Sequence, residues 1–263
     1  DTVGSIGCIA RDTIQSVGSD VIFLSDSGVR SLMRTIQEKS APLRDLSKNV
    51  RFDLNSSLVS ETMANLKSVY SEKEAFYLLV LPTTAQVYCF DTKQSLQDGA
   101  SRVTKWDSIA PTSLRSLRNG DLYIGKNGYI GKYSGYLDDT STYQFAYYTN
   151  NADLGNPNQI SVLKTISAIV IGGSNQYLTI KWGFDYSGAY QAQNIYIPTQ
   201  TSYEYGTAEY GIAEYTSGVP IKTLRANASG AGKIVQTGYE TTINDVALSL
   251  QKIEIQAKDG KLG

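Results

Sequence analysis

Three observations on the amino-acid sequence predict an all-β protein. Tyrosine occurs 19 times and glycine 23 times in 263 residues, against 6 prolines, which suits pleated, half-buried strands joined by tight turns. Apolar residues alternate with polar ones along several segments. Hairpin patterns also recur through the first half of the chain, and strands at such spacing favour a propeller or a sandwich.

The hairpin patterns lie in the first half of the chain. Each joins two apolar runs across a short turn: 20–25 with 29–32, 75–81 with 85–90, and 121–125 with 129–133. The last turn contains Asn127-Gly128, and Asn-Gly is the strongest short hairpin signal. We therefore expect a β-propeller-like region over residues 1–148.

The stretch between the first two hairpins departs from the strand pattern. Within residues 42–67, Leu43, Leu46 and Val50 recur near helical spacing, which predicts one or two short helices. Residues 30–52 also carry six basic and two acidic side chains. Two interpretations fit this charge: a docking face for an acidic partner, or a solvated helix face.

Residues 149–158 are rich in turn formers and predict a linker, so we place a domain boundary there. Beyond it, over residues 149–263, we expect an antiparallel β-sandwich. Leu178, Ile180 and Trp182 alternate strictly, and residues 235–243 do so more weakly. Near the end, Leu248 and Leu250 are even-numbered whereas Ile253 and Ile255 are odd-numbered, so a regular strand would place the two pairs on opposite faces. A bulge near Gln251 and Lys252 would restore one apolar face.

Composition and charge exclude several functions. The formal net charge of -1 provides no global basic field for nucleic acid or an anionic membrane. Histidine is absent, so Ser/His and Cys/His catalytic pairs are excluded. Two cysteines, Cys8 and Cys89, allow one bridge at most. No apolar run reaches the roughly 18 residues of a membrane span. Because the sequence begins Asp-Thr-Val-Gly-Ser, we expect a piece of a longer chain.

No residue pattern indicates an active site. Asp138-Asp139 and the series Glu204, Glu209 and Glu214 are the acid sets that could serve glycoside hydrolysis, but neither has the spacing of such a site. A calcium-loop pattern and a nucleotide fingerprint are missing. We expect no catalytic residues, no metal and no cofactor, and therefore no enzyme.

A basic segment runs from Arg102 to Lys132, with six basic and two acidic residues. Aromatic residues interleave with the basic ones, as in Arg102-Val-Thr-Lys105-Trp106. One interpretation is a conduit wall that touches a polyanion; the other is ordinary strand faces.

The segment Glu204-Tyr-Gly-Thr-Ala-Glu209-Tyr-Gly-Ile-Ala-Glu214-Tyr nearly repeats a pentapeptide. A period of five fits neither a helix nor a pleated strand, so we expect a long loop. Its members Glu204, Tyr205, Glu209, Tyr210, Glu214 and Tyr215 would form an interface loop, or the tyrosines would simply pack down on the surface.

Several segments resemble one protein family. The run Gly7-Cys-Ile-Ala through Val17-Gly-Ser-Asp-Val-Ile-Phe-Leu-Ser-Asp-Ser-Gly-Val-Arg-Ser-Leu32 is similar to the propeller region of the tail tubular protein B, or tail nozzle, class of short-tailed bacteriophages. Similar pieces are residues 70–82, Val87-Tyr-Cys-Phe-Asp-Thr92 and Arg102-Val-Thr-Lys-Trp106, and residues 226–232 and 250–255 resemble the ends of phage virion proteins. The chain is far shorter than that family and lacks its N-terminal platform portion.

The resemblance implies a non-enzymatic structural component of the virion tail, assembled in the host cytoplasm. It implies a hexameric homo-oligomer that lines the DNA exit channel, with a tail adaptor above it and fibres or spikes around it. Arg102, Lys105, Arg115 and Arg118 would then face DNA or a neighbouring subunit. No small-molecule substrate and no membrane insertion are expected. The alternative is a carbohydrate-binding or glycan-cleaving β module, which the tyrosines favour and the two tryptophans disfavour.

Overall fold

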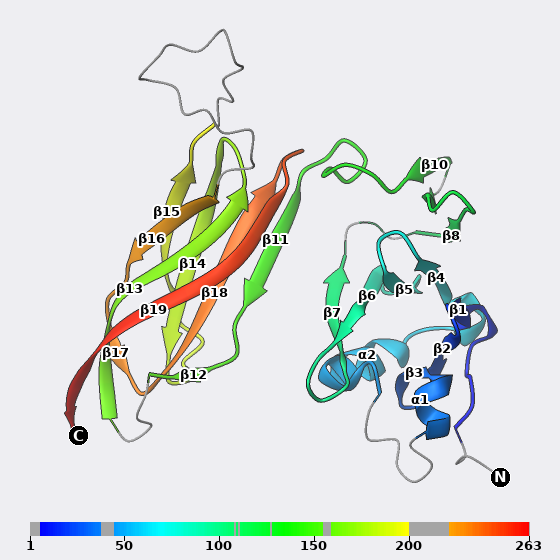
Figure 1. Cartoon of the computed structure of the whole chain (residues 1–263), viewed down its shortest axis with the longest axis horizontal. Coiled ribbons are helices and arrows are strands. Elements are labelled where there is room, and N and C mark those ends of the chain that lie inside the picture. The colour runs from blue at the N-terminus through cyan, green and yellow to red at the C-terminus, as the bar shows by residue number, and fades with distance from the viewer. Residues whose placement is uncertain are drawn as a thin grey trace, which may run out of the picture. The chain divides into compact units, whose positions relative to one another are not determined.

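The computed structural model describes residues 6–37, 45–107, 109, 111–126, 128–154, 159–199 and 221–262. Antiparallel strands make up most of these residues, which confirms the predicted all-β class. The chain divides into two compact units, Asp1–Ser134 and Gly135–Gly263 (Figure 1). The hydrophobic clusters of each unit contain residues of that unit alone, so each unit is described by itself.

The first unit contains three antiparallel sheets whose strands follow one another in chain order. They are β1 (Gln15–Val17), β2 (Asp20–Ser25) and β3 (Gly28–Ser31); β4 (Lys67–Ser71), β5 (Phe76–Leu81), β6 (Gln86–Ser95) and β7 (Ser101–Trp106); and β8 (Ser113–Ser116), β9 (Leu122–Lys126) and β10 (Tyr129–Lys132). The three predicted hairpins are confirmed as β2–β3, β5–β6 and β9–β10.

The middle sheet of this unit has a core on each face. All six residues of β5 are buried. Tyr77 and Leu79 join a cluster with residues of β2, β3 and the helices, whereas Phe76 and Leu78 join a second cluster with Leu122 of the third sheet. Successive sheets therefore stack face to face. The described residues form three such sheets, whereas a propeller repeats four to eight, so the propeller remains a prediction.

Short helices separate the first two sheets, as the sequence predicts. They are α1 (Leu32–Gln37), α2 (Arg51–Leu58) and the 3-10 turns η2 (Lys48–Val50) and η3 (Met63–Asn65), with η1 (Arg11–Thr13) before β1. Leu54 and Leu58 anchor α2 in the core.

The described basic side chains of residues 30–52 bond within the unit. Arg30 is buried and donates hydrogen bonds to the hydroxyls of Ser25 and Ser27. Lys48 pairs with Asp98 at 3.1 Å, and Arg51 pairs with the buried Asp45. Lys39 and Arg44 lie outside the described residues. Arg30, Lys48 and Arg51 therefore stabilise the first unit through contacts within it. Neither interpretation of the sequence predicted this role.

A buried carboxylate holds the turn between β5 and β6. Glu61 is 9% exposed and accepts hydrogen bonds from the backbone N–H of Thr83 at 3.1 Å and of Thr84 at 2.8 Å, and from the Thr84 hydroxyl at 2.9 Å. Burial opposes ionisation, but these hydrogen bonds outweigh it and lower the pKa of Glu61 below its ordinary 4.5. The ionised carboxylate of Glu61 therefore stabilises the turn between β5 and β6.

The second unit is a sandwich of two antiparallel sheets around one core, as predicted. One sheet has the order β11-β18-β14-β15, and β12 also pairs with β18; in the other, β13 pairs with β16, β17 and β19. The strands are β11 (Tyr143–Tyr148), β12 (Ala152–Asp153), β13 (Gln159–Gly172), β14 (Gln176–Phe184), β15 (Gln191–Ile197), β16 (Ile221–Asn227), β17 (Ala231–Gly232), β18 (Ile234–Ile243) and β19 (Leu248–Leu262).

The boundary between the units differs from the predicted one at residues 148 and 149. Strand β11, which precedes that point, pairs with β18 over all six of its residues. Within the predicted linker, Ala152 pairs with Val235. The boundary lies instead between Ser134 and Gly135, because pairing with β18, a strand distant in sequence, assigns β11 to the sandwich.

The predicted bulge in the last strand is confirmed. Ile169 pairs with Lys252 and Val170 with Leu250, so Gln251 is the extra residue. As a result Leu248 and Leu250, before the bulge, and Ile253 and Ile255, after it, all pack against the same core. In Figure 1, β19 runs beside β13 along its length.

Deletion of Gln251 should destabilise the sandwich, because Ile253 and Ile255 would turn away from the core. We expect a loss of about 2–4 kcal/mol, from the burial of two partly buried isoleucines. Urea unfolding followed by circular dichroism measures it. Gln251→Ala keeps the bulge and should change stability by less than about 0.5 kcal/mol; equal losses in both variants would contradict this account.

Glu61→Gln should lower stability in a pH-dependent way. Because the pKa of Glu61 is lowered in the folded state, its carboxylate stabilises the fold above the ordinary pKa, and this stabilisation is lost as the pH falls through the folded-state pKa. At pH 7 we expect a loss of about 1–2 kcal/mol. Urea titrations of both proteins from pH 7 down to acid should show the difference disappearing; a constant difference would refute the role.

Candidate functional site

The structure separates two of the four basic residues that the sequence groups together. Arg102 and Lys105 lie on opposite faces of β7, because side chains alternate along a strand. Val103, on the Lys105 face, packs against the cluster that holds α2, whereas Trp106, on the Arg102 face, packs against the cluster that holds Leu122.

The other two basic residues belong to the third sheet. Arg115 is exposed on β8 and alternates with Leu114, which packs inward. Arg118 is exposed in the turn between β8 and β9. Strand alternation thus puts Lys105 on the other face of β7 from Arg102, and the DNA-facing or subunit-facing role expected of Arg102, Lys105, Arg115 and Arg118 remains a prediction.

Lys105 has a structural partner. Its Nζ lies 3.2 Å from Oδ2 of Asp53 on α2 and 5.5 Å from the centre of the Tyr88 ring. The Tyr88 hydroxyl donates to the same carboxylate at 2.6 Å. The hydrogen bond from Tyr88, together with Lys105, lowers the pKa of Asp53. Burial of the phenol and, to a lesser extent, its hydrogen bond to Asp53 raise the pKa of Tyr88 to about 12. Lys105 therefore ties α2 to the middle sheet.

The predicted interface loop lies outside the described residues. This applies to all of its members: Glu204, Tyr205, Glu209, Tyr210, Glu214 and Tyr215. The contact role of the loop remains a prediction.

Sequence reasoning missed the outer face of the five-stranded sheet. At one end of it Tyr148 and Tyr190 meet edge to face, with ring centres 5.5 Å apart, and their rings occupy the space that a Cβ at Gly238 or Gly183 would need. The sequence did contain a signal for this outer face. The even-numbered residues of β14 form the buried face, so its odd-numbered residues must point outward.

At the other end of this face, Tyr177 and Tyr196 have ring centres 5.2 Å apart and are 59% and 45% exposed. We call Tyr148, Tyr177, Tyr190 and Tyr196 the tyrosine face. Half-exposed tyrosines are typical of contact surfaces.

A charged group lies between the two tyrosine pairs. Glu240 on β18 accepts from Lys181 on β14 at 2.7 Å and from the hydroxyl of Tyr148 on β11. Lys181 and then Tyr148 lower the pKa of Glu240, and Glu240 raises the pKa of both Lys181 and Tyr148. The carboxylate is thus neutralised by side chains of its own sheet.

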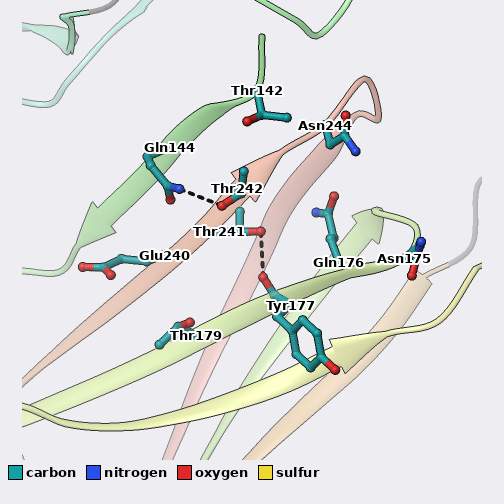
Figure 2. A pocket seen from close by; sticks show the side chains of 10 residues that line it. All are labelled: Thr142, Gln144, Asn175, Gln176, Tyr177, Thr179, Glu240, Thr241, Thr242 and Asn244. Carbon is teal, nitrogen blue, oxygen red and sulfur yellow. Dashed lines mark hydrogen bonds between the residues drawn. The ribbon is translucent and has the colours of Figure 1, made fainter.

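A depression of about 350 Å³ lies at the Tyr177 end of the sheet (Figure 2). Every side chain that lines it carries a hydroxyl, an amide or a carboxylate: Thr142, Gln144, Asn175, Gln176, Tyr177, Thr179, Glu240, Thr241, Thr242 and Asn244. Figure 2 shows Gln144 bonded to Thr242, and Tyr177 and Gln176 pointing in opposite directions from β14. We call this depression the polar pocket.

Gln176 in this lining is 7% exposed, yet neither its Nε2 nor its Oε1 has a hydrogen-bond partner. Leaving a buried polar group unsatisfied costs about 1–3 kcal/mol. Buried amides in folded proteins are nearly always bonded, so this exception calls for a functional or structural explanation.

Of the two acid sets, Asp138-Asp139 lies in the described part of the chain, and the series Glu204, Glu209 and Glu214 lies outside it. Asp138 forms a tight backbone bridge with Ser141, and Asp139 has a positive φ of 47°, so this pair builds a turn. Among the described residues, no three His, Cys, Asp or Glu side chains are grouped so that they could hold a metal ion. Both cysteines are free; burial raises the pKa of Cys89 to about 12.

The chain matches no protein-family model, and no curated protein is significantly similar to it. In the part of the chain that the structure describes, none of the helices has both the length and the apolar character that a membrane crossing needs.

Lys105→Met tests whether this lysine serves the fold. Removing the half-exposed ion pair with Asp53 should lower the stability of the first unit by about 0.5–1 kcal/mol, measured by urea unfolding. Arg102→Met, on the opposite face of the same strand, is the matched control and should change little. A stability loss in the control alone would reverse the assignment.

Proposed function

We propose that this chain is a structural, non-enzymatic component of the tail of a short-tailed phage, of the nozzle or tube-end class. It would be assembled in the host cytoplasm as a homo-oligomer, hexameric if the family likeness extends so far, beside an adaptor and fibres or spikes. It would surround the exit channel and touch genomic DNA only in passing.

The observation that carries this proposal is the stacking of successive sheets in the first unit. Each sheet is a meander of neighbouring strands, and β5 contributes apolar residues to the clusters on both faces of its sheet. Propellers are built by repeating such sheets around a channel. The stacking thus supports the resemblance of residues 7–32, 70–82 and 87–92, which fall on these same sheets.

The edge strand β11 also supports a role in assembly. Its sequence, Tyr-Gln-Phe-Ala-Tyr-Tyr, has no charge and no proline, and its pairing with β18 has no bulge. Proteins usually protect free strand edges with one of these devices. Phe145 and Tyr147 are 39% and 46% exposed. Such a strand offers backbone groups and aromatic surface to a neighbouring subunit.

The basic residues fit only part of the expected channel wall. Arg102, Arg115 and Arg118 are exposed and available to DNA or a neighbour, whereas Lys105 is engaged with Asp53. We therefore restrict the proposed DNA-facing or subunit-facing role to the three arginines.

Substitution of the loop tyrosines tests the proposal. The triple variant Tyr205→Ala, Tyr210→Ala and Tyr215→Ala should fold normally and fail to enter virions, because it removes amphipathic contact area. Incorporation is measured by mass spectrometry of purified particles, and rings by negative-stain microscopy.

Tyr186→Ala is the control, since Tyr186 is 72% exposed and lies outside the loop. It should be incorporated like the parent chain. Absence of the parent chain from virions, or normal incorporation of the triple variant, would refute the proposal.

A further inference from the structure

The polar pocket combines a size, a polar lining and a bordering aromatic ring that together indicate a ligand. Its volume of about 350 Å³ falls within the range of small-ligand sites. We propose that the polar pocket and the adjoining ring of Tyr177 bind a neutral saccharide. The inference concerns the second unit alone and holds whether or not the chain belongs to a phage tail.

The charge of the lining excludes other ligand classes. Among the described residues of the lining, Glu240 is the one carboxylic acid, and Lys181 and Tyr148 already compensate this carboxylate. None of these described residues is a lysine or arginine, so a phosphate, sulfate or carboxylate would find no counter-ion among them. A cation would compete with Lys181 for the same oxygens. The ligand that fits is uncharged.

The polarity of the lining requires a ligand rich in hydrogen-bonding groups. The described residues of the lining supply four amides and five hydroxyls, and none of them has a purely aliphatic side chain. An apolar ligand would desolvate these groups without replacing their hydrogen bonds. A sugar ring carries a hydroxyl on most carbons, each able to donate and accept, which matches amides that do both.

Several of the polar groups keep bonding capacity for a ligand. The Nε2 of Gln144 donates to Thr242 at 2.7 Å, which leaves its oxygen available. The Oδ1 of Asn175 accepts from Tyr196 at 3.0 Å, which leaves its amide N–H groups.

Aromatic surface borders the pocket on one side. Tyr177 lines it and is 59% exposed, and the ring of Tyr196 supports Tyr177 from the neighbouring strand at 5.2 Å. The C–H faces of a sugar ring pack on aromatic faces, while its hydroxyls point sideways to amides. Tyr177 with the amides of the lining supplies both kinds of contact.

The test is a glycan array probed with the full chain, followed by calorimetric titration with maltotriose, cellotriose, tri-N-acetylchitotriose and the best neutral glycan on the array. We expect binding of at least one neutral oligosaccharide, and weaker or no binding of 3′-sialyllactose and sulfated glycans. Tyr177→Ala should weaken the binding about tenfold. Tyr186→Ala, an exposed tyrosine of the same unit outside the pocket, should bind like the parent chain.

Gln144→Leu tests the amides of the lining. Gln144 is exposed on β11, so the substitution should leave the melting temperature nearly unchanged, while weakening saccharide binding about tenfold. Unchanged binding by this variant, preference for anionic glycans, or no neutral ligand on the array would each overturn the inference. Saccharide binding by a chain that never enters virions would refute the tail role alone, and the reverse result would refute this site alone.

Discussion

Burial of apolar side chains on both faces of the middle sheet is the constraint on which the first unit depends. A strand places successive side chains on opposite faces, so the apolar run of β5 cannot be covered by one neighbouring layer. Full burial of one large apolar side chain contributes about 1.5–3 kcal/mol. Sheets must therefore lie on either side, and the chain supplies them in order, with α2 filling the first layer.

The sandwich satisfies the same constraint with a single core, and it needs bulges to do so. β13 and β19 pair over most of their length, yet each twists and changes parity. The extra residues Lys164 and Gln251 restore inward-facing positions after the change. Bulges also bend a strand and increase its twist. A pair this long stays on one core because its register shifts.

Once the inner faces are covered, function is confined to edges and outer faces. In the second unit, Gly183 and Gly238 leave room for tyrosine rings on the outer face, and polar side chains surround the pocket beside them. In our proposals the edge of β11 offers backbone to a neighbour, and the polar pocket offers amides and hydroxyls to a saccharide. Because Gln144 on β11 lines the pocket, a subunit added at this edge would lie beside the ligand.

The amino-acid sequence by itself determined the all-β class, the three hairpins, the buried parity of β14 and the bulge at Gln251, because strand alternation and turn chemistry act between residues close in the chain. Tertiary structure decided the rest. The second unit begins at Gly135 because β11 pairs with β18. Arg102 and Lys105, which the sequence groups together, face different layers because side chains alternate along β7. The polar pocket gathers residues from β11, β14 and β18, and only the pairing of strands distant in sequence brings such side chains together.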